Sequence, residues 1–261
     1  MDIGRSFTYM FDDQEWLKKL GIGGLLVLLS VIPLLNIFTI LVLMGYTLRV
    51  LQNVAKGSDT PLPEWDDWGG DWMKGLMITL AGLIFSIPVL AVSGFSAIVS
   101  SFAYNASSDV ESFMGICIAG LSCLSALWGL LMALYLPAAM IKYAETEEFS
   151  AFFKFGEIFG FIKDNLGNYI VAILLIIVAE LISGFGVILC VVGVFFTSFW
   201  AMLVQPHLLG QVKALAGGIT PVAAAAAPVA PPAPSFGDLS TADLGGFDAE
   251  PEEPTEDEEE A

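Results

Sequence analysis

Four long runs of the sequence carry almost no charged side chain, and they constrain the fold more than any other feature. They span residues 20–48, 75–104, 112–141 and 168–209, and Glu180 is the one acid or base deep inside any of them. A helix needs about 20 apolar residues to cross a bilayer core of roughly 30 Å. The sequence therefore predicts an all-α membrane protein, a multi-pass helical bundle embedded in the lipid bilayer.

The charge of the chain is concentrated at its C-terminal end. The formal net charge is −18, and from Asp238 onward there are eleven acids and no base. Residues 214–261 are rich in Ala and Pro and then in acids, so they cannot bury enough apolar surface to offset the entropy of ordering. We expect a disordered acidic tail that would suit a basic protein partner. Binding of nucleic acid is disfavoured, because it needs basic surface.

The ten basic residues predict the topology, since cytoplasmic flanks are rich in Lys and Arg. If every run crosses once, the bases split four to six between the two sides. If 20–48 and 168–209 each fold back, all ten lie on one side. The second run is long enough for a transmembrane hairpin and has a helix-breaking cluster at 183–186. We therefore expect four full crossings, at 75–104, at 112–141 and twice in 168–209, with both termini cytoplasmic at the cell membrane. Whether 20–48 fully crosses or is re-entrant stays open.

Two segments have the spacing of interfacial amphipathic helices. In residues 1–20 and 149–166, apolar side chains recur every three or four positions and charged ones lie between them. Each segment precedes a predicted hairpin. We expect both helices to lie in the headgroup plane of the membrane.

The segment 49–74 has an unusual content of Pro, Trp and acids. Trp65 and Trp68 lie three residues apart, and Glu64, Asp66 and Asp67 surround them. Tryptophan prefers the membrane interface, so the first hypothesis is an interfacial anchor at the cytoplasmic end of the next span. The alternative is an acidic site for a cation or a partner.

Two polar residues inside the apolar runs are candidates for function. Glu180 either reaches the interface near the outer turn of its hairpin or faces the bundle interior as a transport site. Asn36, close to Pro33, could belong to a broken helix in the first hairpin.

No pattern in the sequence predicts a catalytic, metal-binding or cofactor-binding site. Cys117, Cys123 and Cys190 have no metal-ligand spacing and are expected to pack between helices. His207 is the one histidine and is expected at the interface. We therefore expect a protein that is not an enzyme and binds no cofactor.

Two short patterns bear on modification and assembly. Asn105-Ala106-Ser107 is a glycosylation sequon in the predicted outer loop. Small residues at four-residue spacing, such as Gly115 and Ala119, allow close helix packing and a homo-oligomer.

Three stretches of the chain resemble the family known as domain of unknown function 4013. They are 7–19, the Gly45-Tyr46 pair followed by Arg49, and the 62–68 sequence Leu-Pro-Glu-Trp-Asp-Asp-Trp, and residues 155–169 are similar as well. The resemblance extends over about residues 1–210 and implies an uncharacterised prokaryotic multi-pass membrane protein. It supplies no site residue. The hypothesis that fits most of the chain is a membrane scaffold that recruits partners through its acidic tail, and the alternative is a small-solute or ion transporter or channel.

Overall fold

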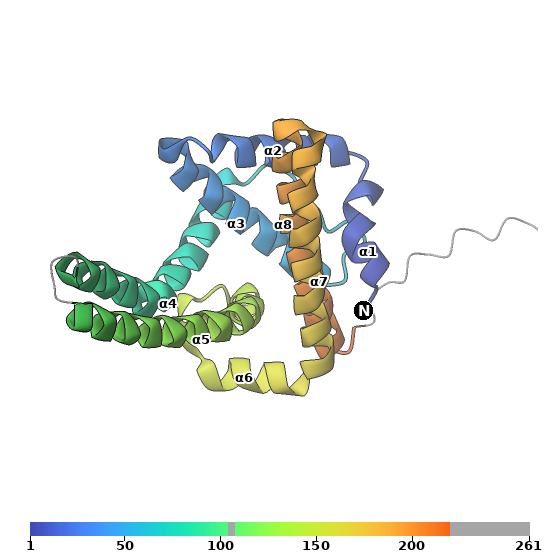
Figure 1. Ribbon diagram of the computed structural model, residues 1–261. Coiled ribbons are helices and arrows are strands. Elements are labelled where there is room, and N and C mark those ends of the chain that lie inside the picture. The colour runs from blue at the N-terminus through green and yellow to red at the C-terminus, as the bar shows by residue number, and fades with distance from the viewer. Residues whose placement is uncertain (104–107, 220–261) are drawn as a thin grey trace, which may run out of the picture. The chain divides into compact units, whose positions relative to one another are not determined.

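The computed structural model describes residues 1–103 and 108–219, and this part of the chain contains helices but no strand (Figure 1). The helices are α1 (Ile3–Thr8), η1 (Tyr9–Asp12), α2 (Trp16–Leu29), α3 (Pro33–Ala55), α4 (Trp68–Ala103), α5 (Ser108–Thr146), η2 (Phe149–Phe153), α6 (Phe155–Asp164), α7 (Leu166–Gly184), η3 (Phe185–Leu189) and α8 (Cys190–Ala216), where η marks a 3-10 helix. The prediction of an all-α fold is confirmed. The predicted sequon at Asn105 and nearly all of the predicted tail 214–261 lie outside the described residues, and only the end of α8 and the following turn belong to the structure.

The core forms around α3, which packs on both α4 and α8. Its side chains Val42, Tyr46 and Leu51 are fully buried. α8 also carries contacts with α2 and α7, so the first and last apolar runs are packed together. Figure 1 shows α8, in orange, beside α2 and α7.

Two glycines let α3 and α4 approach closely. A Cβ atom on Gly45 would collide with the backbone of Asp71, and one on Gly75 would collide with the backbone of Leu41. Small residues at a crossing allow the backbones of two membrane helices to come into contact. Gly45 and Gly75 therefore allow the close crossing of α3 and α4.

The outer parts of α4 and α5 run side by side and expose apolar side chains on their remaining surface (Figure 1). Leu90, Phe102 and Ile116 are each more than half exposed. A surface of this kind is costly in water and suits lipid. Four described helices are long and apolar enough to cross a membrane, namely α3, α4, α5 and α7.

The structure divides the first apolar run differently from the prediction. The turn at 30–32 precedes Pro33, which begins α3 because proline is tolerated in the first turn of a helix. α3 then continues to Ala55, beyond the predicted end at residue 48, and has the length of a full span. α2 has 14 residues and is about 21 Å long at roughly 1.5 Å per residue. The run is therefore one short and one full-length helix.

The predicted N-terminal helix 1–20 is also subdivided. Asp2 caps α1 by accepting a hydrogen bond from the Arg5 backbone at 2.9 Å, and Asp13 accepts one from the Glu15 backbone at 2.8 Å. Asp2 therefore starts α1, and the Asp13 turn separates η1 from α2. Tyr9 and Met10 are buried in the protein core, whereas Leu17 is exposed.

The second predicted amphipathic segment, 149–166, is formed by η2 and α6. Ile158 is buried, whereas Phe155 and Phe159 are each 45% exposed. The breaker at 183–186 lies where α7 ends at Gly184 and η3 begins. α7 and α8 pack against each other on either side of this break.

Candidate functional site

The loop between α3 and α4 is held against α3 by aromatic and polar contacts. The Tyr46 ring stacks on Trp65, with 3.9 Å between centroids and 12° between planes. The Tyr46 hydroxyl donates to the Pro63 carbonyl at 2.9 Å. Trp65 Nε1 in turn donates to the Lys19 carbonyl at 3.2 Å. We call the loop 59–67, together with Tyr46, Arg49 and Asp71, the Trp65 clasp.

Arg49 is the electrostatic centre of the Trp65 clasp. Its Nε and Nη2 donate to the two carboxylate oxygens of Asp71, at 2.7 and 2.6 Å. Nη1 reaches Asp66 Oδ1 at 3.1 Å, and Nη2 also donates to the Glu64 carbonyl at 2.9 Å. The hydrogen bond from Arg49 lowers the pKa of the Asp66 carboxyl. Asp71 is 1% exposed, so the bidentate pair is what balances its buried charge.

Lys19 secures the other side of the loop. Its ammonium lies 2.7 Å from Asp13 Oδ2 and 2.6 Å from Glu64 Oε1, and it donates to the Leu62 carbonyl at 3.2 Å. The Lys19 side chain is almost fully buried. The start of α2, the loop and α3 are thus joined by two cations.

The acids predicted as a cation site have separate partners. Glu64 pairs with Lys19 and Asp66 with Arg49. Asp67 accepts a hydrogen bond from the Gly70 backbone at 2.9 Å, as a cap of α4. Within residues 1–103 and 108–219, no three His, Cys, Asp or Glu side chains are grouped so as to hold a metal ion.

Trp65 and Trp68, the two tryptophans singled out in the sequence, contact each other in the structure. Trp68 Nε1 donates to the Trp65 carbonyl at 2.9 Å, and the two rings are 5.6 Å apart. Trp65 is partly buried against the core, and Trp68 is 39% exposed. Trp65 therefore locks the loop, while Trp68 presents its ring to the surroundings.

The two polar residues predicted inside the apolar runs are not brought together, and neither faces the interior. Asn36 is exposed and donates to the Ser30 carbonyl at 2.8 Å, which stabilises the turn between α2 and α3. Glu180 is exposed on α7, one turn before its end at Gly184. The alternative in which Glu180 faces the bundle interior is therefore not the arrangement in the structure.

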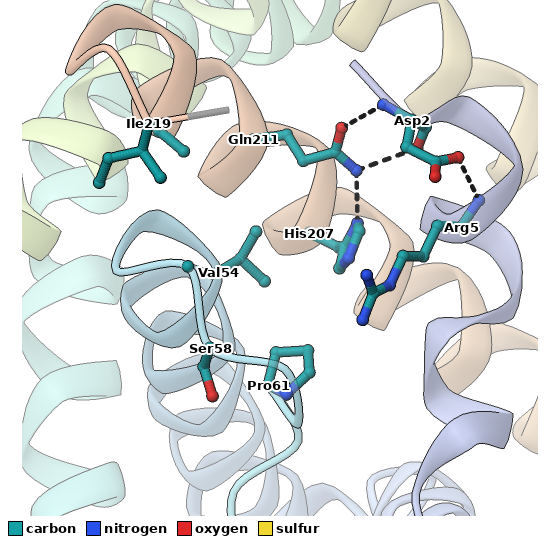
Figure 2. A pocket seen from close by; sticks show the side chains of 10 residues that line it. Asp2, Arg5, Val54, Ser58, Pro61, His207, Gln211 and Ile219 are labelled. Atoms are coloured by element: carbon teal, nitrogen blue, oxygen red, sulfur yellow. Dashed lines mark hydrogen bonds between the residues drawn. The ribbon is translucent and has the colours of Figure 1, made fainter. Parts of the chain in front are cut away.

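Sequence reasoning missed a buried polar cluster between the N-terminus and α8. Gln211 accepts from the Asp2 backbone at 2.7 Å and donates to the Asp2 carbonyl and to Ser6 Oγ, both at 3.0 Å. His207 Nδ1 lies 3.1 Å from both Ser6 Oγ and Gln211 Nε2, and the Tyr9 ring stacks on the imidazole. We call these five residues the N-terminal latch. Figure 2 shows Asp2, His207 and Gln211 of it.

The N-terminal latch corrects the expectation for His207. The residue is 4% exposed, because Ser6 of α1 and Tyr9 of η1 lie against it, so its imidazole contacts protein rather than lipid or water. A small cavity of about 30 Å³, close to the volume of one water molecule, adjoins it (Figure 2). In the sequence, His207 and Gln211 are four residues apart, as are Asp2 and Ser6, which places each pair on one face of a helix. This spacing does not show that the two pairs contact each other.

A second missed feature is a set of ion pairs between helices. Glu147 accepts from Lys74 and from Gln52, at 2.9 and 2.8 Å, and so links α4 to α3. The hydrogen bond from Lys74 is the main reason that the pKa of Glu147 is lowered. Lys142 pairs with Glu157 at 2.9 Å, which links α5 to α6. These ion pairs thus connect separate helices of the fold.

The comparisons with known proteins identify the family. The model of a family described as "Protein of unknown function (DUF4013)" matches residues 26–192. The matched region is narrower than the resemblance over 1–210, and it contains the Trp65 clasp but neither α1 nor most of α8. No curated protein and no solved structure matches the chain. Because the matched region is well over half of the chain, the protein belongs to the DUF4013 family.

Proposed function

We propose that this protein is a non-enzymatic membrane scaffold, which holds a folded polar face at the membrane and recruits a basic partner through its acidic tail. The observation that carries the proposal is that basic side chains of the folded part are paired with carboxylates of the same chain. Arg49, Lys19 and Lys74 are engaged by carboxylates of the same chain. The folded part therefore keeps its loops in place, while the eleven acids from Asp238 onward have no basic residue beside them in sequence.

The placement of the intramembrane polar residues favours a scaffold over the transport alternative. A transporter gathers polar groups near the bilayer midplane, between its helices. Asn36 and Glu180 instead lie on exposed helix surfaces. Ser6 and His207, the one serine–histidine contact in the described residues, are both buried and hydrogen-bonded to structural groups, which argues against a nucleophile there.

Crosslinking from the tail tests the scaffold function. A photoreactive residue at Leu244 is compared in two full-length proteins, one with the native tail and one with the eleven acids changed to Asn or Gln. We expect a discrete crosslinked partner that is lost in the neutral tail and in 1 M salt, where the Debye length falls to about 3 Å. A photoreactive residue at Ser58 is the control. An unchanged crosslink in the neutral tail would contradict the proposal.

A flux assay addresses the transport alternative in the same protein. In proteoliposomes, a scaffold gives no flux that depends on Glu180. Solute or ion flux that is abolished by Glu180→Gln but kept after removal of residues 220–261 would favour transport instead.

We also propose that both termini and the Trp65 clasp are cytoplasmic. The ion pairs that join Arg49, Lys74 and Lys142 to neighbouring elements support a common side for these bases. In a cysteine-free background, single cysteines are placed at Ser58, Ser107 and Ser240 and labelled from outside intact cells. We expect label at position 107 alone, and label at position 58 would reverse the assignment.

A further inference from the structure

Three lysines lie at the C-terminal ends of three helices and border two neighbouring hollows. Lys56 directly follows α3, Lys142 lies near the end of α5, and Lys213 lies in the last turn of α8. One hollow, of about 200 Å³, is lined by residues that include Lys56 and Lys213. The other, of about 220 Å³, is lined by residues that include Lys142 and Lys213. Lys213 and Glu145, which form an ion pair, line both hollows, so the two hollows are neighbours.

The charges around the hollows are positive in sum. Three ammonium groups face two carboxylates, Glu145 and Glu157, which leaves a net charge of +1. Lys213 pairs with Glu145, and Lys142 lies 2.9 Å from Glu157 and 3.5 Å from Glu145. In residues 1–103 and 108–219, no hydrogen bond or ion pair within 4 Å engages the Lys56 side chain. The Glu147 carboxylate, whose charge also acts on Lys56, is bound by Lys74 and Gln52. Each ammonium has three N–H donors, so donors remain for a ligand with several acceptor oxygens.

The rest of both linings is largely apolar. Leu51, Ala55 and Ala144 contribute to the first hollow, and Ile158 and Phe161 to the second. α6, which forms one wall, exposes Phe155 and Phe159 beside its charged residues, as an interfacial helix does. A cationic rim over an apolar floor, at the end of membrane helices, is complementary to the junction between the phosphate and the acyl chains of a phospholipid.

We propose that these two hollows bind the phosphodiester headgroup of an anionic membrane phospholipid. Lys56 and Lys213 donate to the phosphate oxygens, and the apolar lining covers the glycerol end of the acyl chains. The net charge of +1 selects a lipid with one net negative charge over a zwitterionic one. This inference is independent of the role of the acidic tail.

Native mass spectrometry of the full chain in detergent tests the site, with phosphatidylglycerol and phosphatidylcholine added at equal concentrations. We expect phosphatidylglycerol to bind more tightly, and Lys56→Gln to lower its affinity about fivefold, the effect of one lysine near an anionic lipid. Lys213→Gln should have a similar effect. The matched control is Lys163→Gln, which removes an exposed lysine of α6 that lines neither hollow.

Ala144→Trp fills the first hollow without changing its charge, and it should also weaken the binding of phosphatidylglycerol. If Lys213→Gln prevents folding because the Lys213–Glu145 pair is lost, Ala144→Trp still tests the site. Equal binding of the two lipids, or an equal loss of affinity in Lys163→Gln, would overturn the proposal. So would displacement of the lipid by an equal concentration of free glycerol phosphate, because the site would then bind a soluble phosphate.

Discussion

At the scale of single residues, Arg49 has a role that its charge alone does not explain. The guanidinium is the group that satisfies both oxygens of the buried Asp71, and it also holds the loop through the Glu64 carbonyl. Lysine carries the same charge but has no planar fork of donors, so it cannot reproduce this geometry. The structure thereby gives a physical reason for Arg, rather than Lys, at position 49.

Two variants compare the stability contributed by the buried Arg49–Asp71 pair with that of the exposed Arg49–Asp66 pair. We expect Arg49→Ala to destabilise the protein by about 3–5 kcal/mol, because Asp71 would keep a buried and unpaired charge. Asp66→Asn removes the exposed partner of the same guanidinium and should cost no more than about 1 kcal/mol. Unfolding monitored by tryptophan fluorescence in detergent measures both. Equal effects would show that Asp71 does not depend on Arg49.

At the scale of elements, the crossing of α3 and α4 depends on the absence of side chains. Gly75 meets the backbone of Leu41, and backbone atoms cannot move aside as a flexible side chain can. Gly82, about two turns further along α4, has open space where a Cβ would lie. The two glycines of one helix are therefore a matched pair for experiment.

We expect Gly75→Ala to push α3 and α4 apart and to lower Tm strongly, with loss of folded protein in membranes. Gly82→Ala should leave Tm unchanged or raise it, because Ala is favoured over Gly in a helix by up to about 1 kcal/mol. Thermal unfolding of the two purified variants gives the comparison. A mild effect of Gly75→Ala would mean that the close crossing is not needed for folding.

The N-terminal latch belongs to the same scale, since it fastens α1 to α8. Gln211→Ala removes the acceptor for the Asp2 backbone and the donor to Ser6, and it leaves buried polar groups without partners. We expect faster proteolysis near the N-terminus of the variant. Thr8→Ala is the control, because the Thr8 hydroxyl is exposed and donates to Gly4 within α1. Equal cleavage rates for Gln211→Ala and the native chain would contradict the latch.

At the scale of the whole molecule, ion pairs between helices make stability depend on pH. The pKa of Glu147 is lowered by hydrogen bonds from Lys74 and Gln52, relative to an ordinary value of 4.5. A carboxyl whose pKa is lower in the folded state stabilises the fold above the unfolded-state pKa, and this contribution is lost as the pH falls through the folded-state value. The pKa of Glu157 is lowered in the same direction by Lys142.

The part of Tm that these carboxyls supply should therefore be constant between pH 7 and about pH 5.5 and fall below about pH 4.5, the region where the shifted carboxyls take up protons. In Glu147→Gln, Tm at pH 7 should be lower and the decline on acidification shallower. Scanning fluorimetry over this pH range measures both slopes. Parallel profiles for the native chain and the variant would exclude Glu147 as a contributor.

Several features of this protein were determined by the sequence alone. Long uncharged runs require helices, since a bilayer leaves no water to satisfy open backbone groups, and Pro33 and the 183–186 cluster fixed where the runs break. Trp65 and Arg49 were visible as parts of an unusual pattern.

Only the tertiary structure decided what these residues contact. In the sequence, the acids of 64–67 belong first to an interfacial anchor and alternatively to a cation site, and only the structure shows Lys19 beside Glu64 and Arg49 beside Asp66. His207 appeared interfacial until α1 was seen to cover it, and Glu180 had two orientations until its helix was packed. The physical reason is that periodicity specifies a local helix and its apolar face, whereas the partner of a polar side chain depends on which distant segment the fold brings to it.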